Sequence, residues 1–381
     1  MVRSASCFAQ VLTLVDRHGF GRAVRELDAE RGAKGFRCWD QFVAMLFCHL
    51  GSADSLREIC GGLHTSLGRL VHLGMDAAPK RSTLAYANAH RPWELYQRVF
   101  LQVLGRCHEL AGQRRRKFRF KNPLRLLDST VIDLCLETFD WARFRRTKGA
   151  VKLHLQLQDR GCLPCWALVT EGRTHDVRVA QGLSFEPGTI VVMDRGYTDY
   201  ELFGRWDAEG TFFVTRMKAN AAYEVVHAIP GGQGAFRGEE WVRLPGCPCV
   251  LRRIRIWDGE HGRELVLLTN HRTLAATTIG RVYRHRWQIE LFFKALKQNL
   301  KVKTFVGTSE NAVKTQLWTA LVAMLLLKFL QLKSSFGWSL SNLAAMLRFN
   351  LLTYRDLWAW LDDPYNVPVQ EPGPVQLRLA L

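Results

Sequence analysis

Residues 280–300 read GRVYRHRWQIELFFKALKQNL, and the rest of the sequence is best interpreted outward from this stretch. Its apolar residues recur at helical spacing, which predicts one continuous helix. At about 100° per residue, four polar side chains fall on one stripe about 60° wide: Tyr283, Arg286, Glu290 and Lys297. Lys294 lies beside the stripe. One acid flanked by cations and a phenol suits a carboxylate that holds a metal while its neighbours bind phosphates.

The same helix also has a plainer interpretation. Glu290 and Lys294 are four residues apart and can form an ordinary surface pair, worth about 0.2–0.5 kcal/mol on an exposed helix. Two acids upstream favour the metal site instead. Asp128 lies in the segment LLDST and Asp194 in the segment VVMDRGY, each at the end of a predicted apolar strand. The three carboxylates together predict the site.

The spacing Tyr-x2-Arg-x3-Glu-x6-Lys resembles the signature of DDE transposases of the "insertion sequence four" family. Asp128 and Asp194 resemble the first and second acids of that family's triad, and Glu290 resembles the third. The resemblance extends from about residue 124 to about residue 329. It implies a cut-and-paste transposase in which these three acids are catalytic and bind metal. It also implies a β-rich insertion before the signature helix, and a hairpin on the element end as one cleavage pathway.

The periodicity of the chain predicts the fold class. Short apolar strands are predicted over residues 125–132, 151–157, 166–170 and 189–193. Three antiparallel strands followed by α/β crossovers favour an α/β, ribonuclease-H-like (retroviral-integrase-like) catalytic core, preceded by an all-α N-terminal region. The first and fourth strands of such a core are neighbours. We therefore expect Asp128 and Asp194 to lie side by side.

Changes in composition predict the domain boundaries. They give a helical N-terminal DNA-binding region (1–112), a basic linker (113–123), the first part of the core (124–217), a β-rich insertion (218–271), the second part of the core with the signature helix (272–335) and a C-terminal helical tail (336–381). Residues 56–89 fit either a DNA-binding helix-turn-helix or a plain helical bundle. Residues 316–332 are apolar and flanked by lysines, which favours a buried core helix over a membrane span.

The charge of the chain limits its partners. The 381 residues carry 53 Lys and Arg against 35 Asp and Glu, a formal net charge of +18. This charge favours a polyanion, either nucleic acid or an anionic membrane surface, and its spread along the chain fits a long contact rather than a charged tail. Residues 1–20 lack the pattern of a signal peptide. We therefore expect the ten cysteines to be reduced thiols in a cytoplasmic, nucleoid-associated bacterial protein.

The linker contains the run QRRRKFRFK at residues 113–121, in which two phenylalanines are interleaved with six cations. Four of these cations are predicted to contact DNA phosphates: Arg114, Arg115, Arg116 and Lys117. The alternative for this run is a solvated linker. Trp287 is predicted to support an extruded base by stacking, although a buried tryptophan would explain it equally well.

The expected chemistry depends on placing Asp128, Asp194 and Glu290 close together, where they can bind divalent metal ions. Adjacent aspartates repel when both are ionised, and a dication removes this cost. With Glu290, three carboxylates can hold two Mg²⁺ ions ~3.5–4 Å apart, and Mn²⁺ can substitute. The cations of the stripe and its phenol then suit contacts with phosphates: Tyr283, Arg286, Lys294 and Lys297. Asp176 is expected to cap a helix or support the ligands, and Lys152 and His154 share a strand face that points either to the site or to solvent.

These observations favour a bacterial insertion-sequence transposase. Its expected partners are double-stranded DNA, both the terminal inverted repeats of the element and the target, and no membrane. It would cut with a two-metal DDE site and join the 3′ ends to the target. Synapsis of two ends needs at least two active sites, so we expect a homodimer in the synaptic complex. The alternatives are a metal-dependent DNA nuclease on the same fold and a noncatalytic DNA-binding protein, and the intact triad argues against the second.

Overall fold

The computed structural model describes residues 5–66, 69–113, 117–135, 139, 141–145, 148–230, 234–302 and 304–370. The chain divides into two compact units. The helical unit comprises Met1–Arg114, Glu137–Trp141 and Lys294–Leu381. The sheet unit comprises Arg115–Leu136 and Ala142–Phe293.

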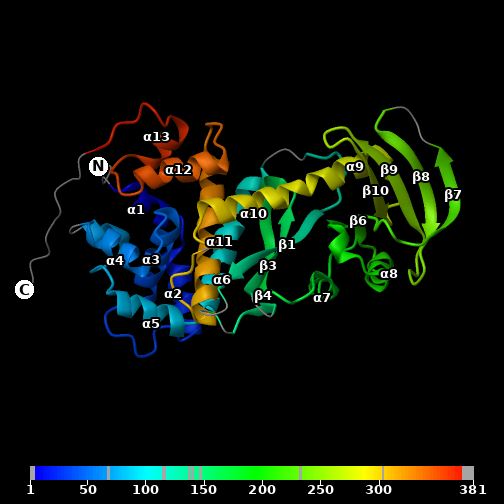
Figure 1. Cartoon of the computed structure of the whole chain (residues 1–381). Coiled ribbons are helices and arrows are strands. Elements are labelled where there is room, and N and C mark those ends of the chain that lie inside the picture. The colour runs from blue at the N-terminus through cyan, green and yellow to red at the C-terminus, as the bar shows by residue number, and fades with distance from the viewer. Residues whose placement is uncertain are drawn as a thin grey trace, which may run out of the picture. The chain divides into compact units, whose positions relative to one another are not determined.

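The helical unit combines helices from both ends of the chain (Figure 1). Its N-terminal elements are α1 (Cys7–Leu12), α2 (Arg17–Glu26), α3 (Cys38–Leu50), α4 (Leu56–His64), the 3-10 helix η1 (Arg69–Leu73), α5 (Arg81–His90) and α6 (Glu94–Gly112). Its C-terminal elements are α11 (Glu310–Lys333), α12 (Leu340–Asn350) and α13 (Leu357–Asp362). Helix α11 packs against α3, α5, α6 and α12, and so forms the centre of this unit.

Helix α11 is apolar around its whole circumference, which is typical of a helix buried in a protein core. Within the described part of the chain it is the one helix long and apolar enough to cross a membrane, but 89% of its most apolar window is buried inside the protein. Its buried Gln316 has internal partners, since the amide donates to the carbonyls of Lys301 and Thr304 at 2.6 and 2.8 Å. The prediction of a buried core helix over 316–332 is confirmed.

Two helix starts in this unit test the sequence rules for caps. Ser55 caps α4, because its Oγ accepts from the Glu58 backbone N–H at 3.2 Å. Ser82 does not cap α5, since the helix begins at Arg81 and Ser82 lies inside it. Lys80 already has the extended backbone of an N-cap (φ −71°, ψ 146°), so the helix starts before the serine is reached.

In the sheet unit, ten strands of the described residues form one sheet. They are β1 (Leu124–Leu134), β2 (Arg143–Arg145), β3 (Lys148–Gln158), β4 (Leu163–Glu171), β5 (Ile190–Val192), β6 (Phe212–Arg216), β7 (Glu224–Pro230), β8 (Phe236–Arg243), β9 (Leu251–Asp258) and β10 (Arg263–Thr269). The order is β2-β3-β1-β5-β6-β10-β9-β8-β7, with β4 paired to β3. Figure 1 labels β3, β1, β6, β10, β9, β8 and β7, which follow one another in this order.

The strand directions divide the sheet into two parts. Strand β3 is antiparallel to β1 and to β4, whereas β5 is parallel to β1 and to β6. This mixed order is consistent with a ribonuclease-H-like fold. Strands β7 to β10 are antiparallel and join the same sheet where β10 pairs with β6. The β-rich segment between the second acid and the signature helix therefore extends the core sheet.

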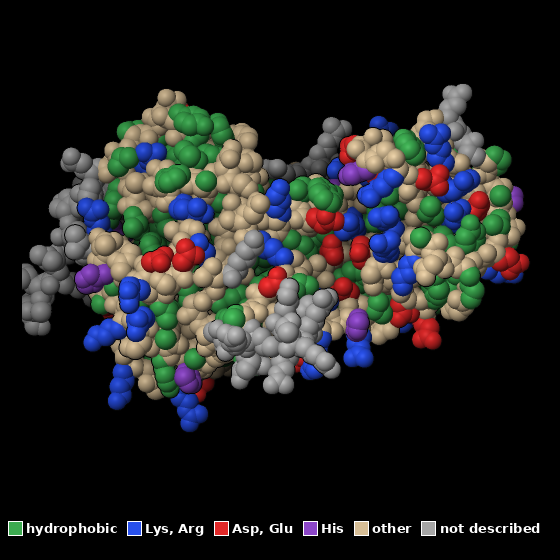
Figure 2. Space-filling view, in the orientation of Figure 1, with side chains coloured by type: hydrophobic (Ala, Val, Ile, Leu, Met, Phe, Trp, Pro, Cys, Tyr) green, Lys and Arg blue, Asp and Glu red, His purple; other side chains and the backbone are tan. Residues whose placement is uncertain are grey.

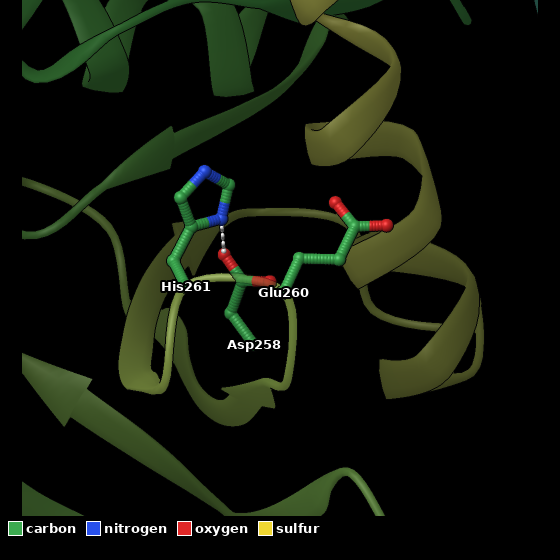
Figure 3. Close-up of side chains that lie close together, drawn as sticks. All are labelled: Asp258, Glu260 and His261. Carbon is green, nitrogen blue, oxygen red and sulfur yellow. Dashed lines mark hydrogen bonds and ion pairs between the residues drawn. The ribbon is translucent and has the colours of Figure 1, made fainter.

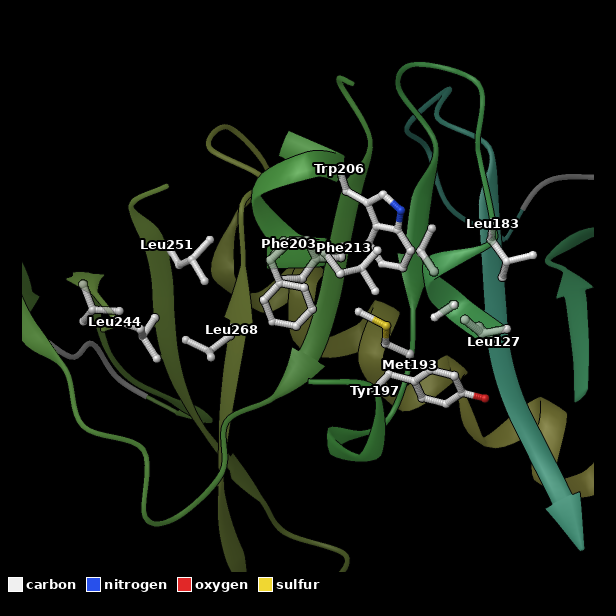
Figure 4. Close-up of a cluster of buried hydrophobic side chains, with 14 residues drawn as sticks. Leu127, Leu183, Met193, Tyr197, Phe203, Trp206, Phe213, Leu244, Leu251 and Leu268 are labelled. Atoms are coloured by element: carbon white, nitrogen blue, oxygen red, sulfur yellow. The ribbon is translucent and has the colours of Figure 1, made fainter. Parts of the chain in front are cut away.

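A buried apolar cluster holds the centre of the sheet unit (Figure 4). It joins β1, β5 and β6 to helix α8 (Tyr200–Ala208), with Phe203 and Phe213 stacked at a centroid distance of 4.1 Å. Leu127 and Met193 belong to this cluster and are fully buried. Burying such a side chain contributes about 1.5–3 kcal/mol. The residues that directly precede Asp128 and Asp194 are thus fixed in the core.

The predicted single helix over 280–300 is two helices. Helix α9 (Ala276–His285) ends and α10 (Trp287–Asn299) begins on either side of Arg286. Across this junction, the Arg286 N–H donates to the Tyr283 carbonyl and the Ile289 N–H to the Arg286 carbonyl, both at 3.0 Å. These bonds span three residues instead of four, which tightens the turn. The prediction of one continuous helix is wrong at Arg286, because the apolar spacing continues through the break.

Candidate active site

The register of two parallel strands brings the first two acids together. Strand β1 pairs with β5 so that Leu126 lies opposite Val192. Two residues further along each chain, Asp128 is level with Asp194, and neighbouring strands are about 4.7–4.9 Å apart. Asp128 lies within β1 and not at its end as predicted, because β3 continues to pair with β1 beyond it. It is β5 that ends before this level, which leaves room beside Asp128.

Asp128 is mostly buried, and its two carboxylate oxygens have different partners. Oδ1 accepts from the Ser129 backbone N–H at 2.8 Å, and Oδ2 accepts from Arg286 Nη1 at 2.9 Å. Burial raises the pKa of Asp128 to about 7, although Arg286 and the Ser129 N–H act in the opposite direction. The negative charges of Asp194 and Glu290 raise the pKa further, so both acids lie within electrostatic range of Asp128.

Asp194 directly follows Met193, the residue after β5, and begins a short turn. Its Oδ1 accepts from the Gly196 backbone N–H at 2.7 Å, and its backbone carbonyl accepts from Thr215 Oγ1 at 2.9 Å. These bonds cap the 3-10 helix η3 (Arg195–Tyr197) and tie the turn to β6. The side chain of Asp194 is therefore held at the edge where β5 stops.

Glu290 completes the set from the first turn of α10. The guanidinium of Arg286 contacts both Glu290 and Asp128: Nη2 lies 2.5 Å from Glu290 Oε1 while Nη1 lies 2.9 Å from Asp128 Oδ2. Within the described residues, the ion pair of Glu290 is thus with Arg286, and not with Lys294 as the plainer interpretation expected. The sequence analysis assigned Arg286 to phosphates only, although its i,i+4 spacing to Glu290 was a visible signal for this pair.

The other residues of the stripe have different surroundings. Tyr283 is buried, with the Arg286 guanidinium carbon 5.7 Å from its ring centroid, and burial raises the pKa of its phenol. Trp287 is 56% exposed, so the alternative of a buried tryptophan is wrong and its role in stacking stays a prediction. Lys294 and Lys297 lie on the second half of α10, which belongs to the helical unit. Their contacts with phosphates stay predictions.

The basic linker reaches the α9–α10 junction through Lys117. Its Nζ donates to His285 Nδ1 at 2.9 Å, and His285 Nε2 lies 2.6 Å from Asp159 Oδ1. Phe118 packs edge-on against the same imidazole. Arg114, Arg115 and Arg116 lie outside the described residues. The sequence analysis did not single out His285, which is buried directly before Arg286.

A second group supports the strand that carries Asp128. Ser129 Oγ donates to Asp176 Oδ1 at 2.7 Å, and Lys152 Nζ lies 3.2 Å from the same oxygen. Asp176 is the first residue of α7 (Asp176–Gln181), and the N-cap is His175. The interpretation of Asp176 as a cap is therefore wrong, while its contact with Ser129 fits a supporting role. His154 lies 3.6 Å from Asp176, and burial lowers its pKa to about 4.

A cavity of about 580 Å³ opens beside the junction. Cations and aromatic rings dominate its wall, among them Lys117, Arg216, Arg281, Arg284, Tyr283 and Trp287. Arg286 also lines it, so one side chain connects the cavity with the carboxylates. Figure 2 shows Lys and Arg side chains gathered over the α9 and β8–β10 part of the sheet unit, with Asp and Glu side chains beside them. Such a surface attracts polyanions.

Another acidic group lies on the wall of this cavity (Figure 3). Asp258 ends β9, and Glu260 and His261 follow in the turn to β10. Asp258 Oδ2 lies 2.9 Å from His261 Nδ1, and the three residues bring possible ligand atoms within 4.8 Å of one another. Glu260 and His261 are exposed, and arginines surround the group in the cavity wall. The sequence analysis did not single out this cluster.

The donor set of Asp128, Asp194 and Glu290 fits a hard divalent cation. All three side chains offer carboxylate oxygens, the ligands that Mg²⁺ and Mn²⁺ prefer. Burial raises the pKa of Asp128 to about 7, and the neighbouring charges of Asp194 and Glu290 act in the same direction, so a bound cation would favour the ionised carboxylate. Arg286 supplies one cation between two of the three acids. Three carboxylates with one cation between two of them retain enough negative charge to bind a dication.

The comparisons with known proteins identify the family of this chain. Residues 119–326 match the family described as "Transposase DDE domain", and residues 3–76 match a domain of unknown function. A "Probable transposase for insertion sequence element IS5377" from Geobacillus stearothermophilus is 30% identical over 276 residues, which are 70% of this chain and 72% of that protein. The "Putative transposase y4zB" of Sinorhizobium fredii is 33% identical over 285 residues, 71% of this chain and 77% of that protein.

More distant relatives carry the same type of name. The "Transposase InsG for insertion sequence element IS4" of Escherichia coli is 24% identical over 157 residues, 38% of this chain and 35% of that protein. The matched family segment contains Asp128, Asp194 and Glu290 and covers more than half of the chain. On this match and on the two longer relatives, the chain belongs to the DDE transposase family.

Proposed function

We propose that this protein is the transposase of a bacterial insertion sequence of the "insertion sequence four" family. Its chemistry is metal-dependent DNA cleavage followed by strand transfer on a ribonuclease-H-like core. The observation that carries the proposal is that Arg286 joins Asp128 of β1 to Glu290 of α10, while Asp194, after β5, is level with Asp128 on the neighbouring strand. Family membership and this arrangement support the same reaction.

In the proposed mechanism, these three acids hold two Mg²⁺ ions, for which Mn²⁺ can substitute. Bound metal supplies Lewis acidity to the water or 3′-hydroxyl that attacks and to the oxygen that leaves. The Ser129 N–H orients Asp128 through Oδ1, and the Gly196 N–H orients Asp194. Because the protein forms no covalent bond with DNA, positioning is its main contribution.

The remaining predicted residues are proposed to hold the DNA. Tyr283 and Arg286 line the basic cavity with Trp287 and Lys117 and are placed to meet phosphates there. Lys294 and Lys297 are proposed to contact phosphates further along α10. Arg114, Arg115 and Arg116 extend this contact along the linker, and residues 1–112 bind the terminal inverted repeats. Two copies of the chain pair two element ends in a cytoplasmic, nucleoid-associated synaptic complex.

Glu290→Gln tests the proposal most directly. The substitution keeps the size of the side chain and an oxygen toward Arg286, but it removes the charge that a dication needs. Cleavage of a duplex bearing an element end should fall by orders of magnitude in Mg²⁺, while DNA binding survives. Gel analysis of cleavage beside a binding titration measures both quantities.

Lys294→Ala is the matched control on the same helix. It removes a neighbouring exposed charge, so it should weaken DNA binding but leave metal-dependent cleavage at saturating DNA nearly intact. Near-normal cleavage by Glu290→Gln would defeat the catalytic role. Cleavage without joined products from the wild-type protein would favour a nuclease over a transposase.

A further inference from the structure

Arg286 occupies the position of a counter-cation between two proposed metal ligands. Its Nη1 contacts Asp128 Oδ2 at 2.9 Å and its Nη2 contacts Glu290 Oε1 at 2.5 Å. The guanidinium is mostly buried, and so is the Asp128 carboxylate that it contacts. Both oxygens of Asp128 are engaged, because Oδ1 accepts from the Ser129 N–H. A dication bound by Asp128 and Glu290 would lie close to the positive guanidinium of Arg286, because both would contact the same carboxylate oxygens.

Like charges at close range repel strongly in a partly buried site. Asp128, Asp194 and Glu290 carry at most three negative charges, and Arg286 already neutralises part of them. Arg286 therefore competes with metal for Asp128 and Glu290 in the protein without DNA. It also holds Asp128 and Glu290 together when no metal is bound. Removing this side chain should make the acids better ligands.

The cavity beside Arg286 provides a second place where its guanidinium can form an ion pair. The side chain lines the 580 Å³ cavity, whose wall carries Arg281, Arg284 and Arg216. A DNA phosphate bound there would meet a cluster of cations, and a guanidinium binds phosphate as a two-pronged donor. The Nε of Arg286 is buried and has no hydrogen-bond partner among the described residues, so its fork is not fully used by the carboxylates.

We infer that Arg286 is an exchangeable counter-cation: it pairs with Asp128 and Glu290 until a DNA phosphate in the cavity withdraws it, and the freed carboxylates then bind metal. DNA and divalent metal consequently bind with positive cooperativity, and by linkage each tightens the other equally. The exchange delays full metal loading until DNA is in place. This inference rests on the proposed function, since it requires the three acids to be the metal ligands.

The test measures metal binding rather than activity. The loss of the free Mn²⁺ signal in electron paramagnetic resonance gives the Mn²⁺ affinity of the full chain, measured at the same pH for every variant. For the wild type, adding a duplex oligonucleotide bearing an element end should tighten Mn²⁺ binding by at least about fivefold, the lower edge of common coupling energies. Arg286→Gln should bind Mn²⁺ more tightly than wild type without DNA, and the duplex should then add little.

Two variants complete the design. Arg284→Gln removes one charge from the same cavity wall without touching the acids, so it should keep the wild-type Mn²⁺ affinity without DNA. Arg286→Lys keeps a charge but loses the fork, so its coupling should be intermediate. A melting curve for each variant confirms folding.

The outcomes separate the two ideas. If Arg286→Gln and wild type bind Mn²⁺ equally and respond equally to DNA, the exchange is wrong, while the metal site stands provided that Asp194→Asn weakens Mn²⁺ binding. If Arg284→Gln tightens Mn²⁺ binding as much as Arg286→Gln, general charge explains the effect and the exchange is also wrong. If Asp194→Asn and Glu290→Gln leave Mn²⁺ binding unchanged, the proposed function itself fails.

Discussion

Helix α3 buries Cys38, Cys48 and His49 inside the helical unit, whereas strand β9 buries Arg252 beside Glu239 inside the sheet unit. These two elements differ in how their buried ionisable groups avoid an unpaired charge. In α3, burial raises the pKa of each thiol to about 12 and lowers the pKa of His49 to about 3, so all three are neutral near pH 7. In the sheet unit, Arg252 and Glu239 are joined by two contacts of 2.7 Å.

The two ways of burying ionisable groups have different effects on stability. A neutral core adds stability through packing, while a buried ion pair costs desolvation and often adds little stability. The pair between Arg252 of β9 and Glu239 of β8 does more than balance charge, because Arg252 Nη1 also donates to the carbonyls of His271 and Leu274 at 2.6 and 2.8 Å. These two residues lead directly into α9. The buried ions of the sheet unit therefore hold the segment that presents Tyr283 and Arg286.

The largest expected effect concerns the acids of the site. Asp194→Asn keeps an oxygen that accepts from the Gly196 N–H but loses the charge. Metal-dependent cleavage should fall by orders of magnitude, while the melting temperature stays within a few degrees or rises, because one of several repelling charges is gone. Cleavage gels and thermal melting measure the two effects.

The control for Asp194→Asn lies on the same sheet. Asp133 is exposed on β1, so Asp133→Asn should change neither cleavage nor melting. Equal cleavage by the Asp194 variant and the Asp133 variant would mean that the charge of Asp194 has no catalytic role.

The next largest effect is on the stability of the sheet unit. Arg252→Leu leaves the Glu239 charge buried without its partner and frees two carbonyls, so unfolding should become easier by about 3–5 kcal/mol. The double variant Arg252→Leu with Glu239→Leu should recover part of this loss, since no unpaired charge remains. Urea unfolding followed by tryptophan fluorescence measures both. If Arg252→Leu alone were as stable as wild type, the ion pair of Arg252 with Glu239 would not stabilise the sheet unit.

The sequence predicted those parts of the molecule that depend on local pattern. Alternating apolar residues indicated β3, and the pairing of β1 with β5 as neighbours followed from the expected order of strands. The break at Arg286 escaped prediction because one tightened turn leaves the apolar spacing unchanged. The contacts of Arg286 with Asp128 and of His285 with Asp159 join residues more than a hundred positions apart. No local pattern encodes such pairs, so only the structure could reveal them.

The neutral core of the helical unit predicts a pH dependence of stability. His49 has an ordinary pKa of 6.5 when unfolded and about 3 when folded, because burial disfavours its charged form. The unfolded chain therefore binds a proton first as the pH falls. Stability from His49 is complete above 6.5 and is lost between about 6.5 and 3, at a slope approaching about 1.4 kcal/mol per pH unit.

His49→Gln isolates this contribution. Its amide can still donate to Thr319 Oγ1, which lies 3.0 Å from His49 Nε2, but it does not titrate. Urea unfolding at a series of pH values should show a smaller loss of stability below pH 6.5 for the variant than for wild type. Parallel pH profiles would mean that His49 is protonated in the folded chain and that the helical core is not a neutral one.

The smallest expected effect comes from an ion pair on the surface of the helical unit, which sharpens the contrast with Arg252. Glu26 at the end of α2 contacts Arg98 of α6, and both side chains are largely exposed. Because water and salt screen such a pair, Glu26→Gln should cost less than about 1 kcal/mol, and added salt should reduce even that difference. The same urea assay at low and high salt measures it, with Arg252→Leu beside it as the buried counterpart. Glu26→Gln keeps a hydrogen-bonding group of equal size, so any loss reports the charge. If it destabilised the protein as much as Arg252→Leu does, burial would not be what distinguishes the ions of the two units.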